Sequence, residues 1–281
     1  MNQVAMEGLV ETARLPLYTM RSAVTSSSLP KLLFLGGSST DFQIKASVFC
    51  SPLVEHFNVV SFEPRGLGRS GAPDGDWSVE DYARDAIALM DAIGWGRVMI
   101  FGESFGAMTA MEIAIHFPER ISHLCLSAAA PGGVGGNSYP IDEFLEMPER
   151  QKAIAALSIQ NTSFPALMKS DSEAAEKVIS ARIIADTHFL NSGNNAIGYP
   201  RLLEARAKHD VFERLNCISA PTIVMSGTHD NQAPLACGQT MADEIPDAEF
   251  LLFEGGHGFS FATTLPSDAL ISRWAQQMKD T

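Results

Sequence analysis

The sequence has little cysteine, no long apolar run and no sign of a secretion signal. Its four cysteines are scattered, and none belongs to a Cys-x-x-Cys pair or to a Cys/His cluster at metal-binding spacing. Neither a disulfide framework nor a metal site is therefore expected. No apolar run reaches the 18 residues of a membrane-spanning helix, and no basic start leads into an apolar core. We expect a cytoplasmic protein without a signal peptide or membrane insertion.

Positive charge is also scarce. The chain has 20 Lys and Arg against 33 Asp and Glu, which gives a formal net charge of −13. An acidic protein repels nucleic acids and anionic membrane surfaces, so neither is expected as a partner. Acidity of this kind is typical of many soluble proteins and says little about a substrate. The oligomeric state is left open by the sequence.

The apolar residues that are present occur in short runs separated by helix-compatible stretches. The runs occupy residues 31–35, 59–62, 98–101, 121–127, 221–225 and 250–253. Continuous apolar runs of this length are typical of strands buried on both faces, and their alternation with helices predicts a parallel sheet. Residues 8–10 and 17–20 are candidates for two antiparallel edge strands. The predicted fold class is α/β, doubly wound, with helices on both faces of a mostly parallel sheet.

The alternation stops between residues 131 and 210. This stretch has no buried-strand pattern and is helix-compatible near 153–157, 172–185 and 202–208. A helical excursion within a strand–helix series predicts a cap over one end of the sheet. We therefore expect a core domain formed by 1–130 and 211–281, with 131–210, called the inserted segment below, as a helical cap.

The most informative motif is Gly102-Glu103-Ser104-Phe105-Gly106, which directly follows an apolar strand and precedes a helix. A serine at such a sharp strand-to-helix turn presents its hydroxyl at the edge of the sheet, and the glycines avoid collisions with the neighbouring strand and helix. A serine hydroxyl is a weak nucleophile unless a histidine and a carboxylate activate it. The motif therefore predicts that both lie further along the chain.

Two residues downstream meet that requirement. Asp230 follows the apolar run at 221–225, and His257 follows the run at 250–253. Loops at the carboxyl ends of parallel strands converge, so both side chains are predicted to approach Ser104. His257 would remove the hydroxyl proton and later return it to the leaving group, while Asp230 would orient the imidazole.

The same chemistry requires hydrogen-bond donors for a developing oxyanion. The backbone N–H of Phe105, directly after the nucleophile, is one predicted donor. The second is expected in the loop at Gly36-Gly37-Ser38, and the N–H of Ser38 is preferred over that of Gly37. A glycine turn needed only for its backbone angles is the alternative for this loop.

Several other residues are weaker candidates. The Gly-x-Gly loop at 65–71 lacks the spacing of a dinucleotide or phosphate site and is interpreted as a structural turn. Glu103 is expected to support the turn, and His229 is a less favoured alternative to His257. The remaining candidates for substrate contact are more simply interpreted as core or surface positions. They are Asp41, Tyr139, His188, Phe189, Tyr199 and His209.

Taken together, these segments resemble the α/β-hydrolase superfamily. The resemblance covers residues 30–130 and 215–280, and includes the loop at 65–70, the serine motif, Gly227-Thr228-His229-Asp230 and Gly256-His257. It implies an eight-stranded sheet, a helical cap after the sixth strand, a Ser-Asp-His triad and no cofactor. Gly36 stands where many members have histidine, and a serine nucleophile argues against the haloalkane dehalogenase branch, which has aspartate there.

The sequence therefore predicts a cofactor-independent serine hydrolase acting on a small ester-like molecule, most simply a carboxylesterase. The alternatives on the same triad are a lactonase, a C–C bond hydrolase and a small-peptide aminopeptidase. The aminopeptidase would need a carboxylate in the cap, for which Glu143, Glu146 and Glu204 are candidates. A non-catalytic small-ligand receptor on the same fold is the alternative from a different class.

Overall fold

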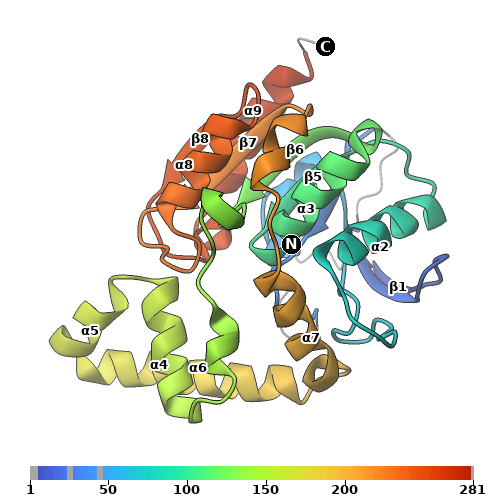
Figure 1. Ribbon diagram of the computed structural model, residues 1–281. Coiled ribbons are helices and arrows are strands. Elements are labelled where there is room, and N and C mark those ends of the chain that lie inside the picture. Colours follow the sequence, from blue (N-terminus) through green and yellow to red (C-terminus); the bar gives the residue numbers. More distant parts are fainter. Residues whose placement is uncertain (1–5, 24–27, 43–46, 280–281) are drawn as a thin grey trace.

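A central sheet of eight strands organises the protein (Figure 1). The computed structural model describes residues 6–23, 28–42 and 47–279. The strands are β1 (Met6–Val10), β2 (Leu17–Arg21), β3 (Lys31–Leu35), β4 (Asn58–Phe62), β5 (Val98–Glu103), β6 (Ile121–Ser127), β7 (Thr222–Gly227) and β8 (Glu249–Phe253). Their order is β1-β2-β4-β3-β5-β6-β7-β8, in which only the β1–β2 and β2–β4 pairs are antiparallel. The predicted doubly wound, mostly parallel sheet with an antiparallel edge is confirmed.

Helices cover both faces of the sheet, because alternate residues of each central strand point to opposite sides. In β3, Leu33 and Leu35 join the core cluster under α2 (Val79–Ala92), α3 (Phe105–His116) and α8 (Leu235–Glu244). Leu32 and Phe34 join the opposite cluster, under α1 (Leu53–His56) and α9 (Leu265–Gln277). Continuous apolar strands are therefore required here, which is the pattern that the sequence displays.

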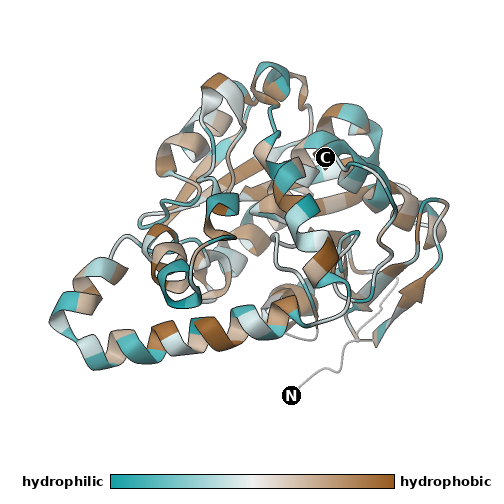
Figure 2. Ribbon diagram, turned by 60° about the horizontal axis from the view of Figure 1, so that its bottom comes forward, coloured by the Kyte–Doolittle hydropathy of each residue, from teal (hydrophilic) through white to brown (hydrophobic). Residues whose placement is uncertain are grey.

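The inserted segment contains no strand and carries four α-helices. They are α4 (Glu149–Gln160), α5 (Phe164–Ser170), α6 (Ser172–Leu190) and α7 (Asn195–Ala207). The helices gather at one end of the sheet, and Figure 2 shows hydrophobic and hydrophilic residues mixed along the long helix α6. No helix in the described parts of the chain is both long and apolar enough to cross a bilayer. The division into a core and a cap at residues 131 and 210 stays a prediction.

Two local details of the helices bear on the sequence-based predictions. The sequence predicts a helix over residues 44–57 that is interrupted or restarted at Pro52. In the structure, a 3₁₀ turn at Ser47–Cys50 and α1 are separated at Pro52, and residues 43–46 lie outside the described residues. Helix α5 was not predicted. The remaining 3₁₀ turns lie at Pro118–Arg120, Gly133–Gly135, Ile141–Phe144, Phe212–Cys217 and Phe259–Phe261.

The loop at 65–71 joins the inserted segment to the core. Asn195, at the start of α7, is fully buried and accepts a hydrogen bond from the Gly68 N–H at 2.6 Å. Its amide nitrogen donates to Asp41 Oδ2 at 2.9 Å. A Cβ at Gly198 would lie 1.8 Å from the carbonyl oxygen of Gly66, so only glycine permits this approach. The contacts are consistent with the interpretation of the loop as a structural turn.

Candidate active site

Ser104 occupies a strained turn between β5 and α3. Its backbone angles are φ 55° and ψ −118°, a conformation that non-glycine residues rarely adopt. A Cβ at Gly102 would lie 2.6 Å from the carbonyl oxygen of Gly106, and one at Gly106 would lie 1.9 Å from that of Leu35. The two glycines of the motif are therefore required by packing, and the turn has the strand–turn–helix form that the sequence predicts.

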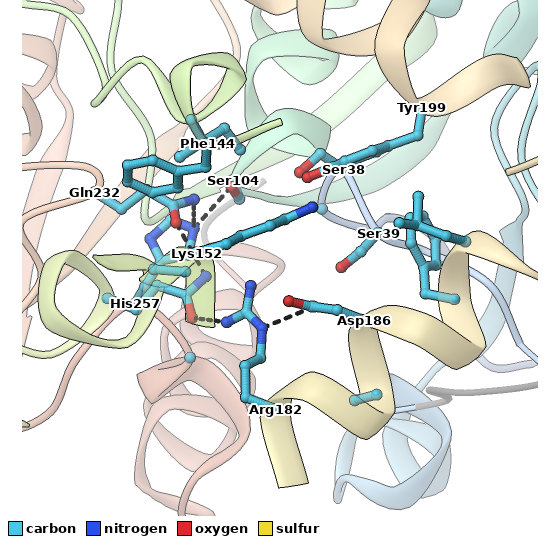
Figure 3. Close-up of a pocket in the computed structure, with 18 of the residues that line it drawn as sticks. Ser38, Ser39, Ser104, Phe144, Lys152, Arg182, Asp186, Tyr199, Gln232 and His257 are labelled. Carbon is cyan, nitrogen blue, oxygen red and sulfur yellow. Dashed lines mark hydrogen bonds and ion pairs between the residues drawn. The ribbon is translucent and has the colours of Figure 1, made fainter. Parts of the chain in front are cut away.

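The structure brings Ser104, His257 and Asp230 into one hydrogen-bonded series. Ser104 Oγ lies 2.9 Å from His257 Nε2 (Figure 3). His257 Nδ1 lies 2.8 Å from Asp230 Oδ2. The buried carboxylate accepts two more hydrogen bonds through Oδ1, from the N–H groups of Gln232 and Ala233, each at 2.9 Å. A carboxylate only accepts, so the imidazole holds its proton on Nδ1 and leaves Nε2 as the acceptor for the serine hydroxyl.

Two backbone N–H groups near Ser104 are available to a ligand. Those of Ser38 and Phe105, the predicted oxyanion donors, have no hydrogen-bond partner in residues 6–23, 28–42 and 47–279. Gly37 lies against Ser104, since a Cβ there would be 3.5 Å from Ser104 Cβ. Unpaired donors beside a serine hydroxyl have the placement that stabilising a developing oxyanion requires.

A cavity of about 310 Å³ opens over Ser104 and His257, and the inserted segment forms much of its wall. The apolar part of the wall consists of Ile141, Phe144, Leu145, Ala156, Ala185, Phe189 and Leu190. Tyr199 also lines the cavity, and burial raises the pKa of its phenol, so it stays neutral. The enclosure has the mixture of apolar wall and few polar groups that small-molecule sites show.

A chain of side-chain amides connects the cavity wall to the histidine. Gln232 Nε2 donates to His257 Nε2 at 2.8 Å, and Gln160 Nε2 donates to Gln232 Oε1 at 3.0 Å. Arg182 Nη1 donates to Gln160 Oε1 at 2.8 Å, and its Nε donates to Asp186 Oδ1 at 2.8 Å. Because a guanidinium has no acceptor, Arg182 determines the direction of both amides. His257 Nε2 consequently faces two donors, the serine hydroxyl and the Gln232 amide.

The last turn of α4 also binds both loops that carry the histidine and the acid. The carbonyl of Gln160 accepts the N–H of His257 at 2.6 Å, and that of Ile159 accepts the N–H of Asn231 at 2.9 Å. A Cβ at Gly256 would lie 2.2 Å from the Gln160 carbonyl oxygen, which explains the glycine before the histidine. The inserted segment is thus attached directly to the loops of the candidate site.

The other candidates from the sequence divide into two groups. Glu103, Phe189 and Tyr199 line the cavity, whereas Asp41, Tyr139, His188 and His209 are not among its lining residues. His229 is directed elsewhere, with Nε2 2.7 Å from Glu254 Oε1. No group of three or more potential metal ligands occurs among the residues that the structure describes.

Sequence reasoning missed several polar residues of the cavity wall. They are Lys152, Gln160, Arg182, Asp186 and Gln232.

His209 does not line the cavity, but as a buried histidine it is expected to affect the stability of the protein. Burial, assisted by the charges of Arg214 and Arg206, lowers the pKa of its ring to about 4, and neither ring nitrogen has a partner in the described structure. The unfolded chain, with an ordinary pKa near 6.5, binds the proton more readily. The contribution to stability is therefore complete above about pH 6.5 and is lost as the pH falls towards 4. We expect this group to lower the free energy of unfolding by up to about 3 kcal/mol over that range.

Urea unfolding at several pH values tests this expectation. The His209→Leu variant should show a shallower decline between pH 7 and 4 than the wild type. His188→Leu, which changes an exposed histidine, should keep the wild-type slope. Equal slopes for the wild type and His209→Leu would show that His209 is not responsible.

Comparisons with known proteins agree on the fold. A family model described as "alpha/beta hydrolase fold" matches residues 32–262. The chain is 27% identical to 3-oxoadipate enol-lactonase 2 of Acinetobacter baylyi, over 81% of this chain and 82% of that protein. It is 28% identical to the putative carbamate hydrolase RutD of Variovorax paradoxus, over 80% and 83%. The crystal structure of the enol-lactonase from Burkholderia xenovorans has a TM-score of 0.74 at 22% identity, covering 97% of this chain and all of that one (100%).

Proposed function

Because the chain belongs to the alpha/beta hydrolase fold family, and two of its relatives are named as an enol-lactonase and a putative carbamate hydrolase, we propose that it is a serine hydrolase whose nucleophile is Ser104. The observation that carries this proposal is the 2.9 Å hydrogen bond between Ser104 Oγ and His257 Nε2, at a histidine whose other nitrogen meets a buried carboxylate. That arrangement supplies a general base in the tautomer that the reaction needs.

The reaction proceeds in two halves. His257 takes the hydroxyl proton as Ser104 attacks the substrate carbonyl, and the N–H groups of Ser38 and Phe105 bind the oxyanion. The imidazolium, oriented by Asp230, then gives the proton to the leaving group, and an acyl group remains on Ser104. A water molecule then attacks this ester as His257 takes one of its protons, and His257 gives that proton to Ser104 Oγ as the bond to the acyl group breaks and the acid leaves.

The bond that we propose is a carboxylic ester, since the nucleophile, the base and two donors suffice for its hydrolysis. An internal ester is the second candidate, supported by the relative named as an enol-lactonase. The aminopeptidase alternative gains no support, because Glu143, Glu146 and Glu204 are not among the residues lining the cavity. We further propose that residues 131–210 act as a cap that limits which acyl and alcohol groups enter the cavity.

Labelling with a fluorophosphonate tests the proposal directly. We expect one label per chain, located on Ser104, and a loss of p-nitrophenyl acetate hydrolysis in proportion to labelling. The Ser104→Ala protein should not be labelled. A wild-type protein that is neither labelled nor able to hydrolyse the ester would contradict the enzyme proposal and favour a ligand receptor.

A further inference from the structure

The cavity contains one cation whose charge no neighbouring carboxylate neutralises. Lys152 lies on α4, and Figure 3 shows its side chain crossing the cavity towards the side occupied by Ser38 and Ser39. Within the described parts of the chain, no carboxylate oxygen lies within 4 Å of its ammonium, and it makes no hydrogen bond. Lys152 is a partly buried residue, and a bound group of opposite charge would compensate an ammonium for the water it loses on burial.

Two of the neighbouring charged groups, those of Arg182 and Asp186, are paired with each other. Arg182 is paired with Asp186 at 2.8 Å and donates into the amide chain that ends at His257. Asp186 is therefore neutralised by the arginine. Glu103, which precedes Ser104 in the chain, also lines the cavity, and no ion pair joins it to Lys152 in the described structure. Lys152 is therefore a cation in the wall that no carboxylate of the described residues pairs with.

The position of Lys152 on its helix fixes it in the wall. Lys152, Ala156 and Gln160 are spaced four residues apart, so they lie on one face of α4, and all three line the cavity. Gln160 is held against the loop of His257 through its carbonyl group, as described above. The helix that carries the ammonium is thus fixed relative to Ser104, which is the condition for a group that selects substrates.

We propose that Lys152 binds a negatively charged group on the substrate, so that the ester hydrolysed by Ser104 carries a carboxylate or a similar anion. This inference rests on the proposed function and specifies its substrate class. Because the protein with a net charge of −13 repels anions as a whole, a cation in the cavity would offset that repulsion locally. Ala156, one turn further along α4, presents only a methyl group to the same cavity.

Two matched pairs of esters test the proposal. In the first, p-nitrophenyl hydrogen glutarate carries the anion on the acyl side, and p-nitrophenyl methyl glutarate is its neutral counterpart. In the second, 4-acetoxybenzoate and its methyl ester place the charge on the alcohol side. The measured quantity is the ratio of kcat/KM for the anionic ester to that for the neutral ester. We expect the wild type to favour the anion in one pair by about 10-fold.

Variants of Lys152 distinguish the effect of its charge from the effect of its side-chain size. Lys152→Met should lower the ratio about 10-fold, chiefly through KM, and Lys152→Arg should retain most of it. Lys169→Met removes the same charge from an exposed position on α5 outside the cavity and should leave the ratio unchanged. Added salt should lower the wild-type ratio, because a half-buried pair is partly screened.

The outcomes distinguish the two proposals. If Lys152→Met changes neither ratio while the neutral esters are hydrolysed, the anion site is wrong and the serine hydrolase stands. If no ester is hydrolysed and Ser104 resists the fluorophosphonate, the proposed function itself is wrong and the anion site fails with it.

Discussion

Replacing Ser104 by alanine should lower kcat for ester hydrolysis by on the order of 10⁴-fold or more. In the proposed mechanism the oxygen of this hydroxyl forms the acyl-enzyme, and no other hydroxyl among the described residues forms a hydrogen bond to His257 Nε2. KM should change little, because the oxyanion donors and the cavity wall are retained. Steady-state kinetics with p-nitrophenyl acetate at neutral pH measure both quantities.

A matched substitution controls for the loss of a hydroxyl. Ser158, on α4, donates its hydroxyl to the carbonyl of Ile154 and does not line the cavity. Ser158→Ala removes the same atom from the inserted segment and should keep wild-type kcat. Thermal unfolding of both variants verifies that they are folded. Full activity in Ser104→Ala would place the nucleophile elsewhere.

The meeting of Ser104, Asp230 and His257 could be predicted from the sequence because all three residues lie at the ends of strands. Ser104, Asp230 and His257 each lie within four residues of the carboxyl end of a parallel strand, and adjacent strands are constrained to about 5 Å spacing. The registers of β5 with β6, β6 with β7 and β7 with β8 then bring the three loops together. The apolar runs locate the strands in the sequence, and the order of the three residues along the chain assigns each of them to one of these loops.

The cavity wall could not be predicted in the same way. Lys152 and Gln160 lie on α4, and Arg182 lies on α6. The polar residues of both helices are equally suited to a face exposed to solvent. Which face of each helix lines the cavity depends on how α4 and α6 pack, and the sequence does not state this. Ile184 lies on the same helix as Arg182 and is exposed, so the hydropathy pattern of this helix does not identify its buried face. Gln232 lies two residues after the predicted acid, so the sequence places it near the site. Only the contact of its amide with His257, however, identifies it as a residue of the cavity wall that reaches the histidine.

The Asp230→Asn substitution should be as severe as loss of the nucleophile, for a reason specific to this site. Asp230 Oδ1 accepts two backbone N–H groups, those of Gln232 and Ala233. In the variant, the amide oxygen must occupy that position, since the NH₂ group would meet two donors there. The NH₂ group therefore faces His257 Nδ1 and forces the imidazole proton onto Nε2. Nε2 can then no longer accept the proton of Ser104, and kcat should fall by on the order of 10⁴-fold.

The comparison with Asp230→Ala distinguishes the effect of the His257 tautomer on activity from the effect of the Asp230 charge. Alanine also removes the carboxylate, but it imposes no tautomer, so the imidazole can still expose Nε2 as an acceptor. We therefore expect Asp230→Asn to be at least as inactive as Asp230→Ala, although it preserves more of the contacts. The rate of fluorophosphonate labelling should fall in parallel with kcat, because both need the same proton transfer. Asp230→Asn activity within about 10-fold of the wild type would mean that Asp230 does not hold the tautomer of His257.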